Sequence, residues 1–163
     1  MQPHTHAEIF IKTLKDVLYA ERKNLGALPT IDRKATDPKL KAALSDHRDE
    51  TEDQILRLEE LFTSIGVPAR GAKFEAIAGH IEEAQNLIAQ IGDAATMEAA
   101  LIALTQAIEN YTFALYETLS PWARELSFPG AAVLLKSAPD EEYAADKRLS
   151  KAAEDRLNAT AAG

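Results

Sequence analysis

The chain has 163 residues, no cysteine and a formal net charge of -8, a length that suits a single domain. Without cysteine, the chain cannot form disulfides, iron–sulfur clusters or thiolate zinc sites. The acidic charge disfavours duplex DNA or an anionic membrane as the main partner, because both attract basic surfaces. Only 7 glycines and 7 prolines occur, while Ala, Leu, Glu and Lys are abundant, which favours an all-helical fold.

The first part of the chain is predicted to form a hairpin of two amphipathic helices. In Ala7–Leu25, apolar residues recur every three or four positions, the period of a helix with one buried face. Three turn-favouring residues mark the end of this helix or the turn after it: Gly26, Pro29 and Asp32. The second helix begins at Asp37-Pro38, an N-cap followed by proline in the first turn, and ends at Gly66-Val67-Pro68.

A short helix and a second hairpin follow. The short helix covers about Phe74–Ile91, and a long helix that is apolar almost all round covers about Thr96–Leu126, with Pro121 expected to kink or end it. The last long helix runs from about Pro129 to Leu157, interrupted at Pro139. The expected fold is therefore an all-α bundle of two antiparallel hairpins, joined by a long crossover that carries the short helix.

Carboxylates occupy positions on or beside the otherwise apolar faces. Each long helix has one near its middle: Glu21, Glu50, Glu109 and Glu142. Glu109 is the only charged residue between Ala99 and Tyr116. Buried carboxylates are costly unless they are paired, protonated or bound to metal, and four at one level raise one another's pKa values. A pair of divalent ions would resolve the conflict, as in the carboxylate di-metal sites of helical bundles.

These residues also have interpretations that involve no metal. Glu21 could pair with Arg22 or Lys23 at the rim of the bundle, and Glu142 belongs to an acidic run of the kind that usually faces solvent. His47 is the only histidine on the apolar face of a long helix, which we call the seam of that helix. It is either a metal ligand or a core histidine bonded to Glu50. Other glutamates are expected on solvated faces: Glu8, Glu52, Glu59, Glu60, Glu82 and Glu98.

Five short motifs follow one another along nearly the whole chain: Asp16-Val-Leu-Tyr19-Ala-Glu21, His47-Arg-Asp-Glu50-Thr51 with Gln54, Gly79 with Glu82-Glu83, Glu109-Asn-Tyr111 with Tyr116 and Thr118-Leu119, and Leu134-Leu135-Lys136 with Glu141-Glu142 and Asp146. In this order and spacing they resemble the YciF/YciE family of ferritin-like stress proteins. The resemblance implies a ferritin-like four-helix bundle with an additional short helix, a homodimer, and a candidate di-metal centre for iron or manganese.

The resemblance also suggests which residues bind metal. It implies four carboxylate ligands, with further ligands or neighbours around them: Glu21, Glu50, Glu109 and Glu142, then His47, Gln54 and Asp146. Glu83 is a candidate to lean in from the short helix. The chain departs from the family pattern at Thr112, where relatives often have a glutamate, and it has His47-x-x-Glu50 rather than the ordinary Glu-x-x-His order.

Three functions compete on this evidence. The first is a ferritin-like metal-binding protein acting against oxidants, and the second is a non-enzymatic stress or interaction protein on the same scaffold with little or no metal chemistry. The third, a DNA-protecting ferritin relative, needs a basic tail or surface that the sequence lacks. Met1–Ile11 lacks a basic region followed by an apolar one, and Ala99–Ile108 is too short to span a bilayer. We therefore expect a cytoplasmic protein whose partners are metal ions and a second copy, with no nucleic acid and no membrane.

Overall fold

The computed structural model describes residues 5–70 and 74–161, and this part of the chain forms six helices. They are α1 (His6–Lys34), α2 (Pro38–Ser64), α3 (Glu75–Gln90), α4 (Ala94–Glu125), α5 (Pro129–Leu134) and α6 (Ala138–Ala161). The described residues contain no strand. A search of the same residues found no helix with the length and hydropathy needed to cross a bilayer.

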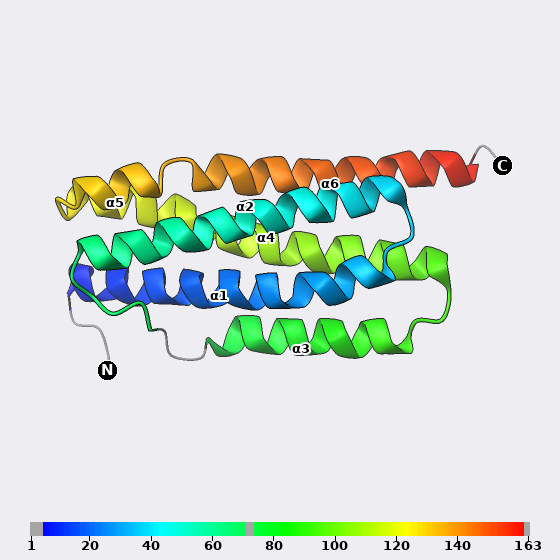
Figure 1. Ribbon diagram of the computed structural model, residues 1–163, viewed down its shortest axis with the longest axis horizontal. Helices are drawn as coiled ribbons and strands as arrows, with labels where there is room; N and C mark the ends of the chain where they lie inside the picture. Colours follow the sequence, from blue (N-terminus) through cyan, green and yellow to red (C-terminus); the bar gives the residue numbers. More distant parts are fainter. Residues whose placement is uncertain (1–4, 71–73, 162–163) are drawn as a thin grey trace.

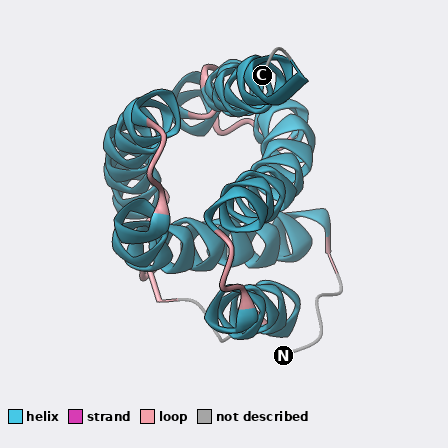
Figure 2. Ribbon diagram, turned by 90° about the vertical axis from the view of Figure 1, so that its right-hand side faces the viewer, coloured by secondary structure: helices cyan, strands magenta, loops and turns pink. Residues whose placement is uncertain are grey.

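The long helices α1, α2, α4 and α6 lie around one interior, and α3 lies outside them against α1 and α4 (Figures 1 and 2). α1 and α2 run antiparallel, as do α4 and α6, whereas α2 and α4 run in the same direction (Figure 1). The segment that carries α3 therefore returns along the length of the bundle. The predicted all-α bundle of two hairpins and a long crossover is confirmed.

The predicted end of the first helix is wrong, because α1 continues through Gly26 and Pro29 to Lys34. Proline inside a helix removes one backbone hydrogen bond and crowds the preceding turn. The apolar face nevertheless continues with Leu28 and Ile31, which are 2% and 5% exposed. Burying two large aliphatic side chains contributes about 3–6 kcal/mol, enough to offset the cost of the proline.

The start and the end of α2 were predicted correctly. Asp37 is the N-cap, and its carboxylate accepts hydrogen bonds from the backbone N–H groups of Lys39 and Leu40 at 2.7 and 3.0 Å. The helix stops before Gly66, whose φ of 69° lies in the left-handed region that a glycine adopts without strain.

The last predicted helix is two helices. α5 ends at Leu134, three residues that belong to no helix follow, and α6 starts at Ala138. Pro139 is then in the first turn of α6, where its missing N–H has no consequence for the helix. Pro121, in contrast, lies inside α4, which continues to Glu125.

Two hydrophobic clusters make up the core, one toward each end of the bundle. One contains Leu28, Leu44 and Leu101, and the other contains Phe10, Phe62 and Leu119. Between them along the helices lies a layer of buried polar side chains, which we name the polar belt: Glu21, Asn24, His47, Thr51, Gln54, Glu109, Thr112 and Glu142. The belt places polar chemistry at the middle of the molecule.

Glu98 was expected in solvent, but it is only 5% exposed. Its Oε1 accepts hydrogen bonds from the backbone N–H groups of Thr36 and Asp37, both at 2.7 Å, and from the Thr36 hydroxyl. A side chain of α4 thus fixes the turn between α1 and α2, which positions α2 within the bundle.

We predict that Glu98→Ala lowers the free energy of unfolding by about 2 kcal/mol, because hydrogen bonds to a charged acceptor are lost. Urea unfolding followed by circular dichroism measures the change. Glu98→Gln keeps an acceptor oxygen and should lose less, and Glu60→Ala, at an exposed position of α2, should change stability by under about 0.5 kcal/mol. Equal stability of Glu98→Ala and the wild type would contradict the prediction.

Candidate metal centre

Three carboxylic side chains meet in the polar belt, each from a different helix. Glu21 on α1, Glu109 on α4 and Glu142 on α6 are 0%, 1% and 2% exposed. The alternatives for Glu21 and Glu142, a rim ion pair and a solvated acidic run, are therefore wrong. The regular spacing of the seam positions carried these residues inward with their apolar neighbours.

Glu109 is bound to His47 of α2. The Nε2 atom of His47 lies 2.7 Å from Oε1 of Glu109 and 2.9 Å from Nδ2 of Asn24, which also donates to the same Glu109 oxygen at 3.4 Å. Burial lowers the pKa of His47 and raises the pKa of Glu109 to about 8. At neutral pH this favours a neutral imidazole beside a protonated carboxyl group.

The pKa values of Glu142 and Glu21 are raised by burial, as that of Glu109 is. Burial raises the pKa of Glu142 well above its ordinary value, and the neighbouring Glu109 raises it further, although the Thr112 hydroxyl donates to its Oε2 at 3.0 Å. Burial also raises the pKa of Glu21 well above the usual range, with Glu142 adding to the rise and the phenol of Tyr116 opposing it. The three groups repel one another's charges, so the metal-free interior favours their protonated forms.

Two predicted ligands, Glu50 and Asp146, are bound to groups other than these three acids, although the charge of Glu50 still raises the pKa values of His47 and Glu109. Glu50 is about one-third exposed and pairs with the guanidinium of Arg148 on α6. Asp146 is half-buried and accepts hydrogen bonds from the side-chain amides of Gln106 at 2.9 Å and Asn110 at 3.4 Å. The ligand roles of Glu50 and Asp146 stay predictions that require these side chains to turn.

Glu83 does not lean inward, because its side chain is exposed on α3. α3 packs outside the bundle, so a side chain on the far side of this helix faces solvent. The suggestion that Glu83 joins the centre is wrong.

Asn24 is a member of the centre that the sequence patterns did not identify. It is 1% exposed and contacts both His47 and Glu109. A signal was present, because Asn24 lies three residues after Glu21 and four before Leu28, on the same helical face. Tyr116, expected to be a core aromatic, is 1% exposed, and its phenol is close enough to Glu21 to affect its pKa.

The donor atoms suit a divalent transition-metal ion. Among the described residues, both oxygens of Glu21, Oε2 of Glu109 and Oε1 of Glu142 are buried without a hydrogen bond of normal geometry. Carboxylate oxygens and an imidazole are ligands that iron and manganese take in proteins. Within the same residues, however, no three His, Asp or Glu side chains are already spaced to hold one ion, so binding requires side chains to rotate.

A bundle of two antiparallel helical hairpins with a long crossover and acidic residues from several helices at its centre defines a ferritin-like protein. Residues 5–162 match DUF892, a domain of unknown function, and the chain belongs to that family. It is 35% identical over 159 residues to the protein YciF of Escherichia coli, covering 97% of this chain and 96% of that protein. The predicted family is confirmed.

Solved structures agree with this assignment. The crystal structure of YciF, a stress protein of E. coli, matches with a TM-score of 0.88 and 34% identity over 96% of this chain and 99% of that one. YcfI from Rhodopseudomonas palustris matches with a TM-score of 0.86 and 35% identity, covering 90% and 94% of the two chains. A protein of Xanthomonas campestris that is 18% identical shows the same fold, with a TM-score of 0.76 and 95% of each chain covered.

The raised pKa values predict that the metal-free protein loses stability as the pH rises from 6.5 to 8. In this window the folded state keeps protons on buried carboxyl groups, Glu109 up to about pH 8, whereas the unfolded chain has released them. The free energy of unfolding should fall by up to about 1.4 kcal/mol per pH unit for each retained proton. Urea unfolding in the presence of a chelator measures it.

Glu109→Gln serves as the control for this prediction, because its amide does not titrate, and it should show a shallower fall between pH 6.5 and 8. The window begins at 6.5 because the lowered pKa of His47 has the opposite effect below that pH. Stability that is flat or rising from pH 6.5 to 8 would rule out the retained protons.

Proposed function

We propose that this protein binds one or two divalent transition-metal ions, iron or manganese, in the polar belt, and that it serves in a stress response. The observation that carries the metal proposal is the burial of Glu21, Glu109 and Glu142 together. The nearby cations Arg57 and Arg148 are bound to other carboxylates, Glu141 and Glu50. A metal ion would supply the positive charge that this interior lacks, and would let the carboxyl groups ionise.

Each residue has a distinct part in such a site. Glu21, Glu109 and Glu142 would bind the ion through their carboxylates, and His47 through its neutral imidazole. Asn24 holds the His47–Glu109 pair from α1, and the hydroxyl of Thr112 fixes one oxygen of Glu142. Such supporting hydrogen bonds orient metal ligands and limit their rotation. The stress role rests on similarity to YciF of E. coli, a stress protein.

The second candidate is a non-enzymatic stress or interaction protein on the same scaffold, with little or no metal chemistry. The pairing of Glu50 with Arg148 favours it, because a predicted ligand is already bound to a cation of the protein. Protonation of Glu21, Glu109 and Glu142 would then remove their negative charge from the interior without a metal ion. The two candidates differ in whether an ion raises the stability of the folded protein.

Under the metal proposal, iron(II) or manganese(II) in large excess over the dissociation constant should raise the melting temperature of chelator-treated protein by about 5–10 °C, because only the folded form binds. Glu109→Gln removes one charged ligand and should show a smaller rise. Without metal, this variant should be at least as stable as the wild type, because the free-energy cost of burying the Glu109 carboxyl group is removed. Differential scanning calorimetry of both proteins, with chelator and then with metal, provides the test.

Two results would decide against metal binding. An unchanged wild-type melting temperature with both ions would contradict the proposal. Strong destabilisation of chelated Glu109→Gln would show that Glu109 is a structural hydrogen-bonding group, which favours the second candidate.

We further predict that Arg148→Met increases the affinity for manganese(II) about tenfold, because Glu50 no longer has to leave an ion pair before it can bind the metal. Isothermal titration calorimetry of the chelator-treated protein measures the affinity. Arg22→Met, which breaks the exposed pair with Glu59, is the control and should leave the affinity unchanged. Weaker binding by Arg148→Met would show that Glu50 is not a ligand.

A further inference from the structure

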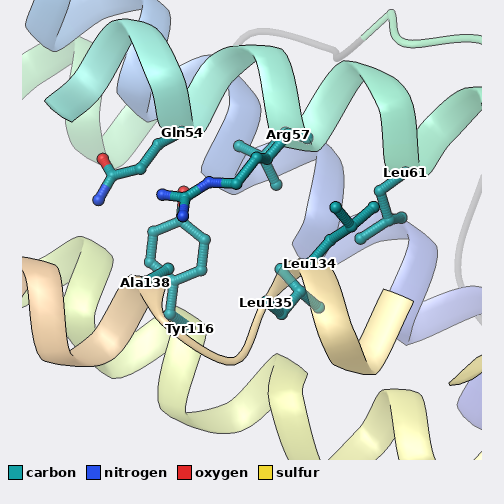
Figure 3. A pocket seen from close by; sticks show the side chains of 8 residues that line it. Gln54, Arg57, Leu61, Tyr116, Leu134, Leu135 and Ala138 are labelled. Carbon is teal, nitrogen blue, oxygen red and sulfur yellow. The ribbon is translucent and has the colours of Figure 1, made fainter. Parts of the chain in front are cut away.

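The recess beside Arg57 leaves no room for a ligand. It is lined by Gln54, Arg57 and Tyr116 together with apolar side chains, and it has no space for even a water molecule. In Figure 3 the guanidinium of Arg57 lies over the hydroxyl end of Tyr116, with Gln54 beside it, so side chains fill this space. Open space lies instead outside the four long helices, between α1 and α3.

A groove of about 460 Å³ separates parts of α1 and α3, the helix that packs outside the bundle (Figures 1 and 2). Its floor is apolar, because Ala27 and Ile81 are 7% and 8% exposed and Ala78 is half-buried. The volume lies in the range of sites for small organic molecules, roughly 300–1,000 Å³. The groove therefore has the size and the apolar floor of a ligand site.

Gly26 keeps this groove open. It lies inside α1, its φ is not positive, and a Cβ atom placed on it would meet no atom within 4 Å. Neither the backbone conformation nor packing therefore requires glycine here, although glycine makes a helix less stable than alanine does. A larger side chain at this position would take up groove space, so the glycine preserves room for a ligand.

The two walls of the groove carry opposite charges. On α1, the ammonium group of Lys23 lies 5.7 Å from the centroid of the Tyr19 ring and forms no ion pair with the described residues. On α3, Glu82 has no hydrogen bond or ion pair within the same part of the chain. Arg22, also on the α1 wall, is already bound to Glu59 at 2.7 Å. A ligand across the groove can therefore meet a positive charge on one side and a negative charge on the other.

We propose that this groove binds a short apolar peptide with free termini, with its carboxylate at Lys23 and its ammonium group at Glu82. An extended dipeptide spans about 7 Å, which suits two charges that face each other across a helix pair without contact, since packed helix axes lie about 8–10 Å apart. The side chains of the peptide would pack on Ala27, Ala78 and Ile81. The inference does not depend on metal binding, because the polar belt lies inside the bundle.

Three matched peptides test the charges of the ligand. Leucyl-leucine, titrated to about 10 mM, should shift the amide NMR signals of residues 19–27 and 78–85 of ¹⁵N-labelled protein, with a dissociation constant of about 1 mM. N-acetyl-leucyl-leucine lacks the ammonium group, and leucyl-leucinamide lacks the carboxylate. Each should bind about threefold more weakly, because each loses one partly exposed ion pair.

Two charge variants assign the termini of the peptide. Lys23→Met should weaken the binding of leucyl-leucine about threefold and leave that of leucyl-leucinamide unchanged. Glu82→Gln should weaken the binding of leucyl-leucine equally and leave that of N-acetyl-leucyl-leucine unchanged. Such cycles isolate the contact between one charge of the protein and one charge of the peptide. Glu83→Gln, at an exposed position of α3 outside the groove, is the control and should bind as the wild type does.

Gly26→Leu tests the groove itself. The new side chain occupies groove space, and binding of leucyl-leucine should weaken at least about tenfold. The urea unfolding midpoint should equal or exceed that of the wild type, because leucine favours a helix more than glycine does. Gly79→Leu makes the same change at an open position of α3 outside the groove, and its affinity should equal that of the wild type.

Three results would overturn the proposal. The first is the absence of amide shifts when leucyl-leucine is added to the wild type. The second is equal binding of the three peptides, which would show an apolar surface without recognition of the termini. The third is unchanged binding of leucyl-leucine by folded Gly26→Leu, which would place the peptide outside this groove.

Discussion

The burial of three acids in one layer is the constraint on which the rest of this structure depends, because burial raises the pKa of each one and the neighbouring acids add to the rise. Glu21, Glu109 and Glu142 lie in one layer of a helical interior, where ionising any one of them raises the energy of ionising the others. Polar side chains contact two of these carboxyl groups: Asn24 and His47 contact Glu109, and Thr112 contacts Glu142. The interior thus has partial compensation for its acids, which a proton or a metal ion completes.

The two arginines near this layer are each paired with a carboxylate. Arg57 and Arg148 both belong to the interface between α2 and α6, and each binds a carboxylate on the opposite helix, with the two polarities reversed. An ion pair that is about one-third exposed contributes little to stability. In each pair the charge of the guanidinium is balanced by Glu141 or Glu50, so neither arginine is free to pair with an ionised Glu21, Glu109 or Glu142.

The sequence predicted correctly that these three acids lie inside the bundle, because the helical period stays regular over many turns. The positions of Glu21 and Glu142 follow from the period of an apolar stripe, whereas Glu109 is the only charge in a stretch of helix that is apolar almost all round. Glu50 stands one position off its seam, and its partner Arg148 is 98 residues away, a pairing that no local pattern contains. The end of α1 was misjudged for a related reason, since the burial of Leu28 and Ile31 by the rest of the bundle outweighs the local effect of Pro29.

The separation of the hydrophobic core into two clusters has a consequence for how the bundle opens. Aliphatic and aromatic packing is interrupted at the polar belt, where α1, α2, α4 and α6 contact one another through polar side chains. We therefore expect each end of the molecule to be able to open locally while the other stays packed. Since the polar belt lies between the two clusters, a proton or an ion bound there would affect how strongly their unfolding is coupled.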